Sequence, residues 1–178
     1  MCFARGSLIM AGINRNGLAG EPGPHCDGGQ VVLTKEENDR LCRVEGDAPM
    51  GQLVRRFWMP FLLSEDLPRP NCPPVRVRLL GEDLVAFRDT EGRIGLVDKF
   101  CAHRCADLFY GRNEEGGLRC VYHGWKFDVH GQCMETPTEQ QDYFRLTVKL
   151  KAYPVEEAGG ILWTYMGPPE LKPARSDF

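Results

Sequence analysis

The stretch that decides the fold is CAHRCADLFYGRNEEGGLRCVYHGW, residues 101–125. It contains two short pairs of metal-ligating residues: Cys101 with His103, one residue apart, and Cys120 with His123, two residues apart. Each pair lies at the end of a predicted strand, IGLVDKF for the first and LRCVY for the second. Two strand-end loops can therefore bring two thiols and two imidazoles to one point.

Each pair mixes one cysteine with one histidine, and this composition predicts a Rieske-type [2Fe–2S] cluster. In such a centre two thiolates hold one iron and two neutral imidazoles hold the other, which raises the potential above that of all-cysteine clusters. We predict Cys101, His103, Cys120 and His123 as the four ligands. The alternative is a structural zinc site, although zinc fingers usually pair Cys with Cys and His with His.

The sequence around these pairs predicts a mostly β fold. VRVRLL (75–80) alternates apolar and basic residues, as a half-buried strand does. DLVAFRD, IGLVD, KFDV, YPVEE and ILWTYM are further short strands, separated by turns such as His130-Gly131 and Gly159-Gly160. We therefore expect a Rieske-type antiparallel β-sandwich with short helices at its N-terminal side.

The chain divides into four predicted parts. Residues 1–30 lack apolar periodicity and are expected to form a disordered extension. Residues 31–74 are a helical and extended preamble, 75–166 the Rieske [2Fe–2S] domain, and 167–178 a linker-like tail.

Within the preamble, Thr34 and Glu37 form a capping-box pattern that predicts a helix through Arg43, with Leu41 as its core contact. A second helical segment is predicted from Pro49 to Arg56, opened by its proline. Residues 57–63 are expected to be extended and mostly buried.

Composition excludes several classes of protein. The formal net charge is -3, from 22 basic and 25 acidic residues, so nothing favours nucleic acid or an anionic membrane as a partner. No apolar stretch approaches the roughly 20 residues that a membrane span needs. Eight cysteines in a chain with an ordinary core, without a convincing secretory signal, indicate metal ligands or free thiols. We expect a cytoplasmic protein.

CAHRCADLFYGRNEEGGLRCVYHGWKFDVHGQC resembles the N-terminal Rieske domain of ring-hydroxylating oxygenases, most closely the phthalate and phenoxybenzoate dioxygenase branch. LTKEENDRLCRVEGDAPMGQLVRRFWMP and PPVRVRLLGEDLVAFRDTEGRIGLVD resemble the same branch, so the likeness covers about residues 31–170. It implies that the predicted Cys and His residues are the cluster ligands and that Arg104 matches the arginine after the first histidine. Cys105 departs from the pattern, which usually has a small residue such as glycine there.

The resemblance also implies a second domain, where two histidines and a carboxylate bind a mononuclear Fe(II) that meets O2 and the aromatic substrate. The chain has four histidines and no D-x-x-H-x-x-x-x-H pattern. His103 and His123 are assigned to the cluster, His25 lies in the extension, and His130 is expected to face solvent in its turn. We therefore expect the mononuclear iron only in a catalytic domain outside this chain.

The resemblance thus implies the electron-transfer domain of an aromatic ring-hydroxylating oxygenase. Its implied partners are an NADH-dependent flavin or ferredoxin reductase and a catalytic oxygenase domain or neighbouring subunit, as in a homotrimer. The alternative is a free-standing Rieske ferredoxin, although such carriers are compact and begin near the first strand. Tyr122 and Trp125 stand where high-potential Rieske proteins have a disulfide cysteine and a serine, which predicts a potential near the low end of the range, around -150 mV.

Overall fold

The computed structural model describes residues 26–27, 30–31 and 33–174. The chain divides into two units between Asp39 and Arg40, and each is described by itself. Most of the segment expected to be disordered, residues 1–30, lies outside the described residues. Of that segment the structure describes one antiparallel strand pair, β1 (Cys26–Asp27) with β2 (Gln30–Val31).

Helix α1 (Lys35–Cys42) begins at the predicted capping box. The backbone N–H of Thr34 donates to Glu37 Oε2 at 2.8 Å, and the N–H of Glu37 donates to Thr34 Oγ1 at 3.2 Å. The predicted core contact of Leu41 is wrong, because no residue of α1 is buried and Leu41 is 50% exposed. The sequence KEENDRLC is mostly charged or polar and has no apolar stripe to bury.

Helix α2 (Pro49–Val54) begins with its proline, as predicted. The segment after it forms strand β3 (Trp58–Leu63), so the extended conformation is confirmed. Its burial is not, because among these strand residues only Met59 is buried, and Phe57 just before the strand is 58% exposed. The reason is that β3 is an edge strand of its sheet and pairs only with β13 (Ile161–Tyr165).

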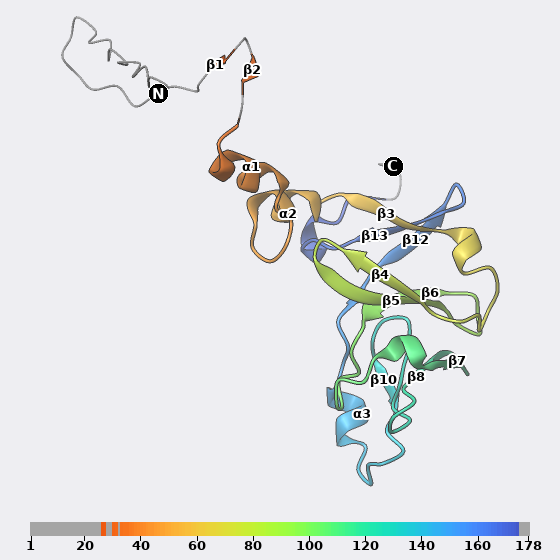
Figure 1. Cartoon of the computed structure of the whole chain (residues 1–178). Coiled ribbons are helices and arrows are strands. Elements are labelled where there is room, and N and C mark those ends of the chain that lie inside the picture. Colours follow the sequence, from red (N-terminus) through yellow and green to blue (C-terminus); the bar gives the residue numbers. More distant parts are fainter. Residues whose placement is uncertain (1–25, 28–29, 32, 175–178) are drawn as a thin grey trace, which may run out of the picture. The chain divides into compact units, whose positions relative to one another are not determined.

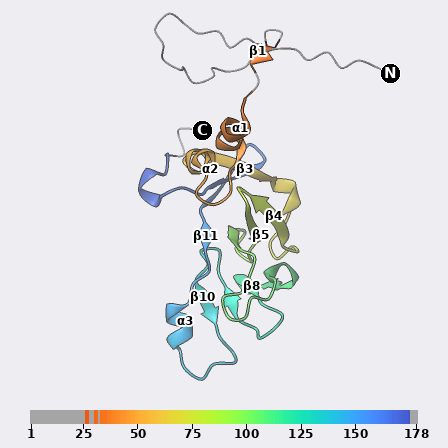
Figure 2. The same ribbon diagram turned by 60° about the vertical axis from the view of Figure 1, so that its left-hand side comes forward.

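Three antiparallel sheets form most of the rest of the described second unit (Figures 1 and 2), which confirms the predicted β class. The first has the order β12-β13-β3, with β12 at Val155–Ala158. The second has the order β11-β6-β5-β4, with β4 (Val75–Leu79), β5 (Glu82–Arg88), β6 (Ile94–Asp98) and β11 (Ala152–Tyr153). The third has the order β10-β9-β8-β7, with β7 (Arg112–Glu114), β8 (Gly117–Arg119), β9 (Lys126–Phe127) and β10 (Cys133–Glu135).

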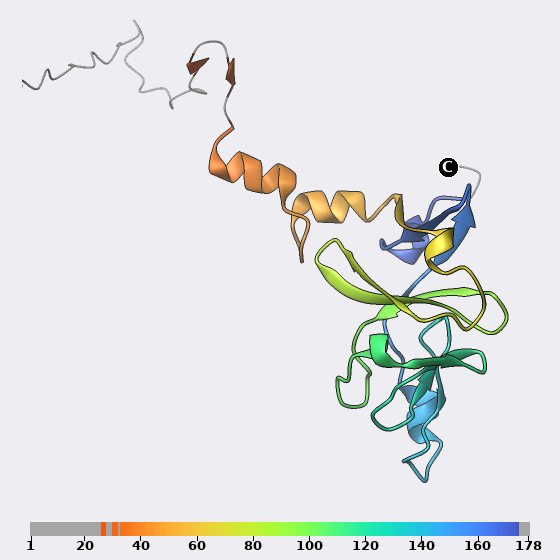
Figure 3. The same ribbon diagram turned by 45° about the vertical axis from the view of Figure 1, so that its right-hand side comes forward.

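The sheet that contains β4–β6 lies between the other two (Figures 1 and 3), and its strands β5 and β6 have buried residues on both faces. Along β5, Leu84 and Ala86 enter the core shared with β3 and β13. Val85 and Phe87 enter the other core, which is shared with the β7–β10 sheet and which we call the second core. Successive side chains of a strand point to opposite faces, so one strand serves both cores. The second core also contains Cys101 and Cys120, two of the predicted ligands.

Short elements complete the described residues: the 3-10 turns Ser64–Asp66, Leu108–Tyr110 and Pro169–Leu171, and helix α3 (Tyr143–Thr147). Part of the predicted tail contacts the first sheet, because the Trp58 indole N–H donates to the carbonyl of Pro173 at 3.1 Å. No helix in the described ranges combines the length and the apolar character of a membrane span.

Glu82, at the start of β5, joins α2 to the segment around β11. Its carboxylate meets Arg55 Nη1 at 2.7 Å, Lys151 Nζ at 2.6 Å and the Tyr153 hydroxyl at 2.6 Å. Burial alone would raise the pKa of Glu82, but these three donors outweigh it and hold the pKa below its usual value. The ionised carboxylate therefore stabilises the fold.

We expect acid to remove this contribution. Because the folded pKa is lowered, the stabilisation is fully present above the unfolded value of about 4.3 and is lost as the pH falls through the folded value. Urea unfolding of the wild type and of Glu82→Gln should show a gap in stability at pH 7 that narrows below about pH 4. A gap that stays constant with pH would contradict this role for the carboxylate.

Candidate metal centre

The two predicted ligand segments fold in the same way. We call residues 101–106 loop 1 and residues 120–125 loop 2. In each loop the first cysteine N–H donates to the carbonyl five residues on: Cys101 to Ala106 at 2.9 Å, and Cys120 to Trp125 at 2.8 Å. In each loop the residue four positions on donates back to the cysteine carbonyl: Cys105 to Cys101 at 2.9 Å, and Gly124 to Cys120 at 3.1 Å. The repeated geometry presents one cysteine and one histidine from each loop.

The two cysteines meet in the second core. Cys101 is 2% exposed and Cys120 is 3% exposed, and their side chains are within hydrogen-bonding reach of each other. Burial, with the neighbouring Cys120, raises the pKa of the Cys101 thiol to about 11, although the backbone N–H groups of His103 and Arg104 lower it. Without a metal this thiol is protonated at neutral pH, so binding a metal must release a proton.

The two histidines lie side by side at the outer edge of this site. Their ring centroids are 4.7 Å apart, at an angle of 63°. Burial lowers the pKa of His103, and charges on His123 and Arg104 lower it further, which favours the neutral ring that metals bind. The Nδ1 atom of His103 is buried and has no hydrogen-bond partner. A buried polar atom without a partner needs an explanation, and a bond to a metal is one.

These four residues fit a two-iron cluster. Such a cluster takes two thiolates on one iron and two imidazoles on the other, so each iron needs only two protein ligands. Among the described residues, no group of three or more His, Cys, Asp or Glu side chains is placed to hold a single metal ion.

Aromatic rings cover both histidines. The Trp125 ring stacks on His103, with centroids 4.5 Å apart and planes 4° from parallel. Trp125 is 3% exposed, and its indole N–H donates to Thr138 Oγ1 at 3.2 Å. The Tyr122 ring lies 3.8 Å from His123 and is 62% exposed. Trp125 covers His103 from inside the core, whereas Tyr122 lies at the surface.

Other residues singled out in the sequence lie away from the centre or have no assigned contact there. His130 is exposed in its turn, as expected, and His25 lies outside the described residues. Of the other cysteines, Cys72, Cys105 and Cys133 are free thiols. Sequence reasoning missed the charged row Arg119, Lys126 and Glu135 beside loop 2. The first two flank the ligand motif directly, but Glu135 carries no signal in the sequence.

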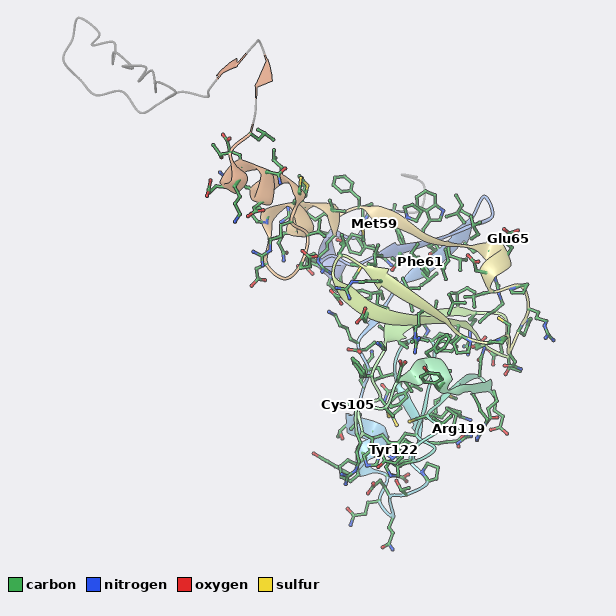
Figure 4. All side chains as sticks on the ribbon, viewed as in Figure 1. Met59, Phe61, Glu65, Cys105, Arg119 and Tyr122 are labelled. Atoms are coloured by element: carbon green, nitrogen blue, oxygen red, sulfur yellow. The ribbon has the colours of Figure 1, made fainter. Side chains whose placement is uncertain are left out.

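Cys105, where related sequences usually have a small residue, adopts a backbone conformation that is unfavourable for a residue with a side chain. Cys105 has φ 52° and occupies in loop 1 the position that Gly124, with φ 77°, occupies in loop 2. This left-handed conformation costs a residue with a side chain about 1–2 kcal/mol, whereas glycine adopts it freely. Figure 4 labels Cys105 at the same end of the molecule as Tyr122.

We expect opposite effects from two exchanges at these equivalent positions. Cys105→Gly should stabilise the protein by about 0.5–1 kcal/mol, the left-handed cost less the greater unfolded-state freedom of glycine. Gly124→Ala should destabilise it by about 1–2 kcal/mol. Urea unfolding of the metal-free proteins measures both effects, and a destabilised Cys105→Gly would show that the thiol makes a compensating contact.

The chain is similar in sequence to known proteins. The sequence profile of the Rieske [2Fe–2S] domain matches residues 57–154. The phthalate 4,5-dioxygenase oxygenase subunit of Pseudomonas putida is 54% identical over 143 residues, which are 80% of this chain and 33% of that protein. The 3-chlorobenzoate-3,4-dioxygenase oxygenase subunit of Comamonas testosteroni is 48% identical over 144 residues, 80% of this chain and 33% of that protein.

Solved structures are similar as well. Dicamba monooxygenase bound to dicamba superimposes with a TM-score of 0.61 at 30% identity, over 67% of this chain and 37% of that one. The chain thus spans about a third of the length of the curated relatives it matches. With a domain profile that covers more than half of its residues, the chain belongs to the Rieske [2Fe–2S] domain family, whose members bind a [2Fe–2S] cluster.

Proposed function

We propose that this chain is the electron-transfer domain of a multicomponent aromatic ring-hydroxylating oxygenase. The observation that carries the proposal is the meeting of two buried thiols and two adjacent imidazoles, one of which has a buried Nδ1 without a hydrogen-bond partner, in a chain similar to oxygenase subunits. When bound, a [2Fe–2S] cluster accepts and releases one electron at a time. Residues 75–166 would form the cluster-binding part.

Each side chain of the site has a role in this proposal. Cys101 and Cys120 would hold one iron as thiolates within the second core. His103 and His123 would hold the other iron through their imidazoles. Trp125 excludes water on the His103 side, and the N–H groups of His103 and Arg104 point to the Cys101 sulfur.

The partners follow from the relatives, which are named as oxygenase subunits. An NADH-dependent flavin or ferredoxin reductase would deliver electrons, and a mononuclear iron in a catalytic domain or neighbouring subunit, as in a homotrimer, would receive them. The free cysteines of the described residues agree with a reducing compartment, and we place the protein in the cytoplasm.

The proposal is tested by a turnover assay. The purified chain, loaded with iron and sulfide, is mixed with NADH, a flavin reductase, Fe(II) and a panel of aromatic acids. We expect NADH to reduce the chain, seen as bleaching of its visible spectrum, without any hydroxylated product. Product should form only when a catalytic oxygenase domain is added or fused. Hydroxylated product from this chain alone, coupled to NADH, would contradict the proposal.

The second candidate, a free-standing Rieske ferredoxin, makes a different prediction. Free-standing Rieske ferredoxins begin near the first strand, whereas here α1 and α2 precede the first strand of the β4–β6 sheet. This helical preamble favours the oxygenase domain. A free carrier would pass electrons to a separate, complete oxygenase that already has its own Rieske centre. Stimulation of such an oxygenase by catalytic amounts of this chain would favour the carrier.

A further inference from the structure

A row of three charged residues crosses the third sheet beside loop 2. Arg119 of β8 lies opposite Lys126 of β9, and Lys126 lies opposite Glu135 of β10. Directly opposite residues on neighbouring strands project from the same face, so their side chains meet. We call Arg119, Lys126 and Glu135 the charged row.

Glu135 joins the two cations of this row. Its Oε2 lies 2.8 Å from Arg119 Nη1, and its Oε1 pairs with Lys126 Nζ. The two cations are largely buried, with side chains 12% and 3% exposed. Two neighbouring buried cations repel each other and lose hydration, so a carboxylate between them compensates both costs. Glu115 adds a second bridge, 3.2 Å from each cation.

Two residues of the charged row flank loop 2 in the sequence. Arg119 directly precedes Cys120, and Lys126 directly follows Trp125, the residue that stacks on His103. Arg119 Nη1 also donates to the carbonyl of Gly124 at 3.1 Å, next to His123. The guanidinium therefore contacts loop 2 from within the row (Arg119 is labelled in Figure 4).

We propose that Glu135 is a positioning residue for the metal centre: through Arg119 and Lys126 it fixes the ends of loop 2 and sets the charge beside the cluster. This inference rests on the proposed function, because it takes Cys120 and His123 as ligands. Glu135 does not touch the ligands itself. It acts through Arg119 and Lys126, the two cations that flank loop 2 in the sequence.

The charge has a predictable effect on the potential. Two ferric ions, two sulfides and two thiolates sum to zero charge, and reduction adds one negative charge. Removing the carboxylate of Glu135 should favour the reduced state, whereas removing the cation of Arg119 should disfavour it. If removing either charge only loosened loop 2, the changes in potential would have no reason to be opposite in sign.

The experiment uses the whole chain with its cluster. Glu135→Gln should release iron to a chelator about tenfold faster than the wild type, as expected for loss of an outer-shell partner. Its midpoint potential should rise, and that of Arg119→Gln should fall. Unchanged release and unchanged potential in Glu135→Gln would overturn the inference. Should Glu135→Gln fail to fold, Glu135→Asp replaces it, and wild-type release in that shortened variant would count equally against the inference.

A matched control exists in the same chain. Arg88 of β5 and Glu157 of β12 form an ion pair at 3.0 Å between two sheets, with side chains 14% and 40% exposed, close to the 12% and 41% of Arg119 and Glu135. Glu157 lies on β12, outside the sheet and the loops that hold the ligands. Glu157→Gln should therefore leave both iron release and potential unchanged. A change as large as that of Glu135→Gln would show a general effect of surface charge and contradict the inference.

Amide hydrogen exchange of the metal-free protein separates this inference from the proposed function. In Glu135→Gln the amides of Cys120 and Gly124 should exchange faster, whereas those of Cys101 and Cys105, in the equivalent loop 1, should not change. This result would stand even if the wild type bound no iron, in which case the proposed function alone would fail. Equal exchange of loop 2 in wild type and variant would show that Glu135 does not fix the loop.

Discussion

Cys120→Ser is expected to abolish the [2Fe–2S] centre. A serine hydroxyl is a poor ligand for iron beside sulfide, and Cys120 supplies one of the two thiolates that the proposed centre requires. The variant purified from the same cells should lack the visible colour, the iron and the acid-labile sulfide of the wild type. Because metal-binding energy is part of the folding energy, it should also unfold at a lower temperature than the loaded wild type.

The control for this exchange is Cys133→Ser. Cys133 is buried in the same core to the same degree, 3% exposed, and is a free thiol. Burial raises its pKa to about 11, so it remains a protonated thiol at neutral pH. Serine at this position should leave the iron and sulfide content unchanged. Loss of the cluster in both variants would trace the effect to core packing rather than to ligation.

Trp125→Ala is expected to have the largest effect on the stability of the metal-free protein. Trp125 belongs to the second core, stacks on His103, and contacts Phe144 of α3 with ring centroids 6.0 Å apart. Removing a buried tryptophan leaves a cavity, and the free energy of unfolding should fall by about 3–5 kcal/mol. Urea unfolding of the metal-free protein measures this fall.

Trp125→Phe separates packing from hydrogen bonding. Phenylalanine keeps a ring against His103 but loses the indole N–H that donates to Thr138. We expect Trp125→Phe to retain most of the stability that the alanine variant loses. An alanine variant as stable as the wild type would show that α3 and loop 1 close over the space without this ring.

The sequence points to these four residues as ligands because the two Cys–His pairs are each close together in the chain, and their binding of a cluster stays a prediction. A Cys and a His one or two residues apart need only a short loop to share a site, and strand patterns on either side place those loops. The equivalent hydrogen bonds of loops 1 and 2 were not predictable, because they depend on backbone carbonyls rather than side chains. The left-handed conformation of Cys105 was hidden for the same reason, since the residue type gives no hint of it.

The β class followed from alternation, but the burial of particular segments did not. In VRVRL the alternation correctly separates exposed Arg76 and Arg78 from buried Val77. In WMPFLL the apolar run suggested burial, yet its place at a sheet edge is set by pairing with β13, about 100 residues later. The charged row shows the same limit, because Glu135 reaches Arg119 only through the register of three strands.

We propose that this chain holds a [2Fe–2S] cluster with two cysteine and two histidine ligands. Electron paramagnetic resonance of the dithionite-reduced protein, with resolution of nitrogen couplings, tests it most directly. We expect a rhombic signal from one reduced cluster per chain, carrying hyperfine couplings from two imidazole nitrogens. A protein with stoichiometric zinc and no signal, or a signal without nitrogen couplings, would contradict the claim.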